Sequence, residues 1–273
     1  MVALSDHFGT ASLNHFHTSK FGIKSLCFTP KNESMTMKSI IIGASSGIGK
    51  ALAVKLSSEG YTLGLTARRV ELLEDLKHQL ETETFIERMD VSEFNTATDG
   101  LENLFKKMGQ IDLIIISAGT GHANDALDFQ LEQETINVNA TGFVNLACLA
   151  YRHFQKNRKG HLVGISSIAM LRGNPGAPAY NASKALISNY MEGLRLKALK
   201  EKANIYVTDI RPGYVDTPMA ESDHLFWVSS PDKAAAQIYR SIQSKKKIAY
   251  ITRRWRLIAL LMKIMPDFLY KNF

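Results

Sequence analysis

A tyrosine and a lysine stand four residues apart in a segment of helical character. Tyr180 and Lys184 fall within residues 179–202, whose apolar spacing predicts a helix, so their side chains share one face. A phenol has an ordinary pKa of about 10, and a neighbouring ammonium favours its ionised form and draws that pKa down. Such a phenol can donate a proton to an alkoxide or take one from an alcohol. The spacing alone is a weak signal, because it also occurs by chance.

A serine accompanies this pair. Ser167 closes a predicted strand at 161–166, thirteen residues before Tyr180. A hydroxyl at this place could hydrogen-bond to the oxygen of a carbonyl and stabilise the charge that grows there during reduction. The alternative is a hydroxyl that caps a turn, and Ser166 competes for the chemical role.

An asparagine could complete the group. Asn139 lies in a helical stretch predicted to run over 129–155. Its amide could serve the chemistry, or it could only hydrogen-bond within its helix, with Asn137 as its rival.

A glycine-rich turn lies between a predicted strand at 38–42 and a predicted helix at 51–58. Glycines allow the tight turn and a close approach of backbone to pyrophosphate, and the helix N-terminus offers N–H groups to phosphate. A strand before and a helix after the turn give it the context of a dinucleotide site. The residues that we expect to bind the pyrophosphate are Gly43, Ser45, Ser46, Gly47, Ile48 and Gly49.

Two arginines follow the second predicted strand, at 61–66. An NAD site usually has an acid here to bind the ribose hydroxyls. Arg68 and Arg69 occupy the place instead, and guanidinium groups suit the 2′-phosphate of NADP(H). The alternative is a pair of solvent-facing side chains at the start of a helix.

The elements that must position these residues alternate along the chain. Apolar strands separated by amphipathic helices predict right-handed βαβ units, and therefore a Rossmann-like, doubly wound parallel sheet of about seven strands with helices on both faces. The expected strands are 38–42, 61–66, 84–87, 111–117, 161–166, 205–210 and 248–252. The expected helices are 51–58, 70–80, one around 101–108, 129–155, 179–202 and 231–243. No linker interrupts 37–252, which we interpret as one α/β domain.

The two ends of the chain differ from this domain. Residues 1–36 lack periodicity, and we expect a disordered extension or a start codon placed too early, with Met35 or Met37 as the working start. The net charge of +7 is carried entirely by residues 244–273, which hold eight Lys/Arg against one acid. The basic pI therefore predicts no nucleic-acid partner.

The tail at 253–273 is basic at its start and apolar after it. Its apolar run is too short to span a bilayer. It could lie on a membrane surface with its cations facing anionic headgroups, or it could pack on the domain or on a partner subunit.

Several motifs in order resemble the short-chain dehydrogenase/reductase family, in its compact single-domain branch, over about residues 38–252. The glycine spacing G-x-x-x-G-x-G, Asn139, Ser167 and the Tyr180/Lys184 pair carry the resemblance, although Ile42 and Ser117 replace the usual Thr and Asn. The resemblance implies that Ser167 polarises the carbonyl, that Asn139 holds a water that feeds protons to Lys184, and that Lys184 holds the nicotinamide ribose. It also implies further cofactor contacts at Asp90, Val91, Ala118, Gly119, Tyr180, Pro212, Gly213, Val215 and Thr217.

The sequence therefore predicts a cytoplasmic NADP(H)-dependent carbonyl reductase or alcohol dehydrogenase, with NAD(H) as the less favoured cofactor and no metal. Apolar residues after Met219, and others near Ser167, suggest a mainly apolar substrate; they are Leu225, Phe226, Trp227, Met170, Leu171 and Tyr214. The resemblance implies a homo-oligomer, and the tail allows peripheral membrane contact. The alternatives are a non-catalytic NADP-binding sensor or scaffold and an enzyme that acts on a sugar nucleotide, although the latter relatives have a longer substrate domain.

Overall fold

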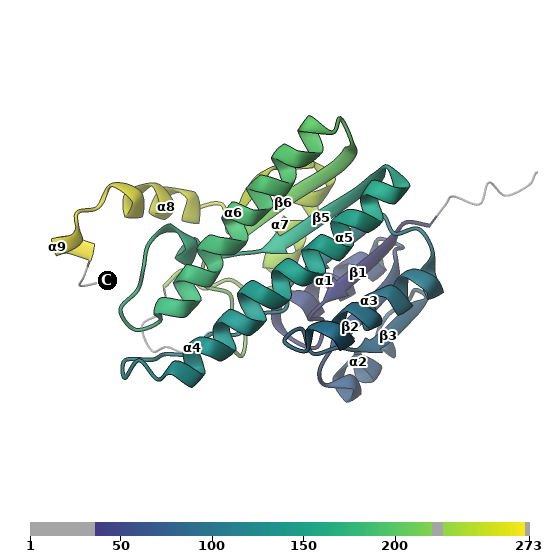
Figure 1. The fold of residues 1–273 in the computed structure, drawn as a ribbon, viewed down its shortest axis with the longest axis horizontal. Helices are drawn as coiled ribbons and strands as arrows, with labels where there is room; N and C mark the ends of the chain where they lie inside the picture. Colours follow the sequence, from purple (N-terminus) through teal and green to yellow (C-terminus); the bar gives the residue numbers. More distant parts are fainter. Residues whose placement is uncertain (1–35, 220–225, 271–273) are drawn as a thin grey trace, which may run out of the picture. The chain divides into compact units, whose positions relative to one another are not determined.

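The computed structural model describes residues 36–219 and 226–270, so that nearly all of the predicted N-terminal extension, and Leu225, lie outside the described residues. Seven parallel strands in the described part of the chain form one sheet in the order β3-β2-β1-β4-β5-β6-β7 (Figure 1). The strands are β1 (Lys38–Ile42), β2 (Thr62–Ala67), β3 (Thr84–Arg88), β4 (Leu113–Ile116), β5 (Lys159–Ile165), β6 (Asn204–Pro212) and β7 (Ile248–Ile251).

Helices cover both faces of this sheet, as the near-continuous apolar strands predict. Alternate side chains of a strand point to opposite faces, so Ile40 and Ile42 join the core beneath α3, α5 and α6, whereas Ile41 joins the core beneath α1, α2 and α7 (Figure 1). The helices over the sheet are α1 (Gly47–Ser58), α2 (Val70–Lys77), α3 (Phe94–Met108), α5 (Phe143–Asn157), α6 (Pro178–Lys200) and α7 (Pro231–Gln243). The remaining helical segments are α4 (Phe129–Ile136), η1 (Asn137–Gly142), η2 (Ile168–Leu171), α8 (Trp255–Ile264) and α9 (Asp267–Tyr270).

The predicted fold class and order of elements are confirmed, with one interruption that the pattern did not predict. The stretch at 129–155 is not one α-helix: α4 and α5 are joined by η1, a π-helical turn that contains Asn139. A π turn widens the helix by one residue, and such turns are frequent at functional sites. Apolar spacing averages over several turns and does not register a single wider one.

The strand order reverses between β1 and β4. From β1 the chain builds outward through β2 and β3, and then crosses to β4 on the other side. Ligands of doubly wound sheets bind in the crevice beyond the carboxyl ends of the strands at this point. The glycine turn leaves β1 here, and Ser117–Gly119 leaves β4 beside it, tied through Ser117 N and Ala118 N to Ile42 O.

None of the helices in 36–219 and 226–270 combines the length and the apolar character that crossing a bilayer requires.

Candidate active site

The glycine turn is packed so closely that side chains would not fit. Gly43 has a φ of +89°, and a Cβ built on it would lie 2.5 Å from Ala118 N. A Cβ on Gly49 would lie 1.9 Å from Gly43 O. Both positions therefore require glycine. Val91, three residues after the end of β3, belongs to the apolar cluster against which Ala118 packs.

The start of α1 is open to an anion. Its N-cap residue, Ser46, makes no side-chain capping bond, and its first turn contains no acid. The first N–H groups of a helix have no partner within the helix, and they carry positive potential. A Cβ on Gly47 would lie 3.0 Å from Thr217 Cγ2, so the fold brings the loop after β6 to the glycine turn.

The two arginines after β2 flank this turn. Arg69 Nη2 donates to Ser45 Oγ at 3.4 Å, which places its guanidinium beside the glycine turn. Arg68 Nη1 lies 4.0 Å from Asp90 Oδ2. Asp90 in turn accepts bonds from the N–H and hydroxyl of Ser92 at 3.0 and 2.6 Å. Two cations thus stand where an NAD site would present a carboxylate.

Tyr180 and Lys184 lie in the first two turns of α6, and the lysine is buried. Lys184 Nζ donates to Ile165 O at 3.2 Å and lies 5.6 Å from the centroid of the Tyr180 ring. Burial lowers the pKa of Lys184 to about 8, against the attraction of the Asp209 carboxylate, which raises it. The ammonium is therefore easily deprotonated for a lysine.

The pKa of Tyr180 moves in the direction opposite to the one predicted from sequence. Burial raises it, the Ser167 hydroxyl lowers it as a hydrogen-bond partner, and Tyr214 raises it further. The reason is that desolvation disfavours the phenolate, while the Lys184 ammonium is directed at Ile165 O. The phenol therefore keeps its proton at neutral pH, which is the state that can donate.

The structure distinguishes the two neighbouring serines. Ser166 is buried, and its hydroxyl donates to Asp209 and to Ile210 O, at 3.0 Å to the latter, so its role is structural. Ser167 lies at the start of η2, where its oxygen accepts from Ala169 N at 3.1 Å. Ser167 also faces the Tyr180 phenol. Ser167 therefore caps the turn, and its chemical role stays a prediction.

Asn139 is wholly buried, and it holds the loop after β4. Its Oδ1 accepts from Thr120 N at 2.8 Å, and its Nδ2 donates to Thr120 O at 2.7 Å and to Ser183 Oγ at 3.1 Å. A Cβ on Gly119 would lie 3.2 Å from Asn139 Oδ1 and 3.4 Å from Lys184 Nζ. The side-chain amide of Asn139 is thus bonded to protein groups, and it fixes the loop that borders Lys184. The water that the resemblance places at Asn139 stays a prediction.

Two residues of this site were missed in the sequence. A Cβ on Gly121 would lie 2.7 Å from Tyr180 Cδ2, so this glycine sets the position of the ring. Asp209 is buried on β6, where it accepts from Ser188 Oγ at 2.8 Å and Arg211 Nε at 2.7 Å. Gly121 has no local signal, whereas an acid in an apolar strand could have drawn attention, since buried charges need partners.

The loop after β6 packs on the start of α8. A Cβ on Gly213 would lie 2.0 Å from Trp255 Cε2, and this buried indole stands 5.4 Å from the Tyr214 ring and 5.1 Å from the Phe226 ring between centroids. Among the other predicted residues, Val215 is buried and pairs with Ser229, while Met170 and Leu171 lie half-buried in η2. Trp255, from the tail, thus packs against two of the apolar residues that the sequence suggested for the substrate side, Tyr214 and Phe226.

The chain was compared with known proteins. Residues 38–225 match the family described as short chain dehydrogenase. An uncharacterised oxidoreductase of Listeria monocytogenes is 34% identical over 197 residues, which cover 69% of this chain and 79% of the relative. The 3-oxoacyl-[acyl-carrier-protein] reductase of Thermotoga maritima is 32% identical over 193 residues, which cover 67% and 75%. The structure of a short-chain dehydrogenase from Sphingobium yanoikuyae in complex with NADPH has the same fold, with a TM-score of 0.71 at 21% identity over 85% of this chain and 97% of that one.

Proposed function

Because this chain belongs to the short-chain dehydrogenase family of oxidoreductases, we propose that it interconverts a carbonyl compound and its alcohol with NADP(H), and that Tyr180 is the general acid and base. The observation that carries the proposal is the convergence of three groups beside the glycine turn. Lys184 Nζ lies 5.6 Å from the centroid of the Tyr180 ring, and the Ser167 hydroxyl interacts with the phenol.

The described residues fit a phosphorylated dinucleotide. Gly43 and Gly49 let the turn pack directly against Ala118 and against its own backbone, and the uncapped start of α1 suits a pyrophosphate. Arg69, which touches Ser45, is positioned for a 2′-phosphate, and this favours NADP(H) over NAD(H). When bound, the reduced cofactor would supply a hydride to the carbonyl carbon.

The side chains supply the proton and hold the oxygen. As the carbonyl oxygen becomes negative, Ser167 donates a hydrogen bond to it and the Tyr180 phenol transfers its proton, so that one hydride and one proton give the alcohol. The phenolate left on Tyr180 attracts the Lys184 ammonium, which lies 5.6 Å from the centroid of the Tyr180 ring. A lysine with a pKa of about 8 exchanges protons with water near neutral pH, so it can return a proton to the phenolate.

The surroundings of the site support an apolar substrate. Met170 and Leu171 follow Ser167 in η2 and are half-buried, and Tyr214 and Phe226 form an edge-to-face pair with 5.9 Å between their centroids. These side chains offer little hydrogen bonding, so they favour a ketone or alcohol with hydrocarbon substituents.

The test is the oxidation of NADPH, followed by its absorbance, with a panel of apolar ketones. Tyr180→Phe removes only the proton donor, and it should lower kcat about 10²- to 10⁴-fold while leaving the NADPH dissociation constant unchanged. A variant as fast as wild type would refute the role of Tyr180. Tight NADPH binding without turnover of any ketone or alcohol would instead favour the sensor or scaffold.

A further inference from the structure

The C-terminal helix α8 is apolar on both of its faces. Trp255 and Ala259 are buried toward the protein. The opposite face presents Leu257, Leu260, Leu261 and Ile264, which are 70%, 62%, 46% and 72% exposed. Their spacing of i, i+3, i+4 and i+7 lines them along one stripe, which we call the outer stripe. Contiguous apolar side chains of this kind are normally covered, and no described residue covers this stripe.

The outer stripe is held in this orientation by contacts at both ends of the helix. At its start, Trp255 packs against Tyr214 and Phe226. Around its end, Arg172 donates to Met262 O at 3.4 Å, to Met265 O and to the Asp267 carboxylate. These contacts join α8 to the loops after β5 and β6, so the stripe faces outward as part of the folded structure.

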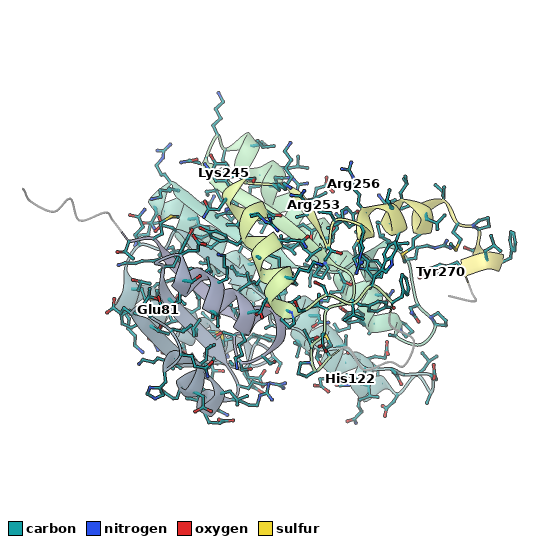
Figure 2. All side chains as sticks on the ribbon, turned by 180° about the vertical axis from the view of Figure 1, so that it is seen from behind. Glu81, His122, Lys245, Arg253, Arg256 and Tyr270 are labelled. Carbon is teal, nitrogen blue, oxygen red and sulfur yellow. The ribbon has the colours of Figure 1, made fainter. Side chains whose placement is uncertain are left out.

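A basic groove runs beside the stripe, between α7, β7 and α8. A hollow of about 780 Å³ is lined by five cations that form no ion pair within the described residues: Arg240, Lys246, Arg253, Arg256 and Lys263. An adjoining hollow of about 330 Å³ adds Lys233 and Arg254. The described residues that line the two hollows include no carboxylate. Figure 2 shows Arg253 and Arg256 near the start of α8.

A buried hydroxyl in the groove also lacks a partner. Thr252 lines the smaller hollow and is 6% exposed, and its Oγ1 makes no hydrogen bond within the described part of the chain. Buried polar atoms are normally satisfied. A phosphate oxygen between Thr252 and the neighbouring cations would accept the free hydroxyl proton.

From these features we infer that α8 and the basic groove form a docking surface for an anionic lipid membrane. The outer stripe enters the boundary between headgroups and acyl chains, and Arg256 and Lys263, which flank one edge of the stripe on the helix, meet the lipid phosphates. A helix of ten residues is about 15 Å long, so it lies in the plane of the interface and does not cross it.

Other occupants fit the surface less well. A second copy of the chain paired by a two-fold axis would set this basic patch against itself, and its described lining offers no carboxylate to balance the cations of the other copy. A nucleic acid would neutralise the cations but would leave four aliphatic side chains against a polar backbone. A surface of anionic lipid offers acyl chains to the outer stripe and phosphates to the basic groove.

The experiment is flotation of the full-length protein with vesicles of phosphatidylcholine alone or mixed with phosphatidylglycerol. We expect binding to the mixed vesicles, weakened by salt. Arg256→Gln with Lys263→Gln should weaken it about thirtyfold, because each cation contributes about fivefold at such a surface. Leu260→Gln with Ile264→Gln should weaken it at least tenfold, because both side chains would stay in water.

Matched controls come from exposed residues elsewhere. The control for the leucines is Leu196→Gln with Leu199→Gln on α6, and the control for the cations is Lys106→Gln with Lys200→Gln. These side chains are exposed and far from α8 along the chain, so both controls should leave vesicle binding unchanged. Thermal melting and NADPH binding show that every variant is folded.

Three results would overturn the inference. They are equal binding of wild type and both α8 double variants, binding of inorganic phosphate without binding of anionic vesicles, and a dimer in sedimentation that Leu260→Gln with Ile264→Gln dissociates.

Discussion

Gly121 offers a sharp test of how the site positions its proton donor. Its substitution by alanine adds one methyl group, whose carbon would lie 2.7 Å from Tyr180 Cδ2, 3.1 Å from Cε2 and 3.3 Å from Cγ. Carbon atoms in contact are ordinarily separated by about 3.5 to 4.0 Å. The ring must therefore retreat by about 0.8 Å or more, because three of its atoms meet the new group at once.

A displacement of this size should lower kcat strongly and change the NADPH dissociation constant little. A misplacement of about 1 Å at a reacting group can cost about a hundredfold in rate, so we expect Gly121→Ala to lower kcat for NADPH-dependent ketone reduction by about that factor. Overpacking should cost about 1–3 kcal/mol of stability. The NADPH dissociation constant should change less than about threefold, because the glycine turn and Arg69 are untouched.

The matched control is Gly193→Ala. This glycine lies in α6, the helix that carries Tyr180, and a Cβ on it would meet nothing within 4 Å. The substitution should leave kcat unchanged and raise stability by about 0.5–1 kcal/mol, since alanine favours a helix. If Gly121→Ala kept wild-type kcat, or if it weakened NADPH binding as much as it lowered kcat, the reasoning about the ring would be refuted.

Three further predictions concern the cofactor and the buried charges. Arg69→Gln should weaken NADPH binding about ten- to a hundredfold and NADH binding little, in fluorescence titrations, because only NADPH carries the 2′-phosphate; equal weakening of both would contradict the role of Arg69. The rate of reduction at saturating NADPH should fall as the pH rises through about 8, because the Lys184 ammonium loses its proton there and not near 10.5; a rate that stays flat to pH 10 would contradict this. Asp209→Asn should move that fall in rate to lower pH, since the carboxylate raises the pKa of Lys184. It should also lower the free energy of unfolding, measured in urea, by about 3–5 kcal/mol, because Arg211 stays buried without its partner. Unchanged stability and an unchanged pH profile would show that Asp209 has neither role.

Proton linkage at Lys184 also affects stability. Its pKa in the folded chain, about 8, is lower than the ordinary value of 10.5. Between these values the unfolded chain binds the extra proton, so this residue adds stability as the pH rises from about 8 to 10.5. The same group therefore favours the fold at alkaline pH, where catalysis is expected to decline.

The strands, the helices and the fold class of this protein could be predicted from local sequence. Strands and helices were predictable because their apolar periods of two and about 3.6 residues are properties of short segments. Arg69 and the glycine turn were predictable for a similar reason, since they adjoin the ends of strands whose place in a parallel sheet is known from the fold class.

Only the tertiary structure decided how the side chains meet. The collision of a Cβ on Gly121 with Tyr180 and the contact of Trp255 with Gly213 join residues that are far apart in the sequence. The raised pKa of Tyr180 and the lowered pKa of Lys184 follow from burial by such distant groups. Desolvation depends on everything that surrounds an atom in space, and no local pattern of residues specifies it.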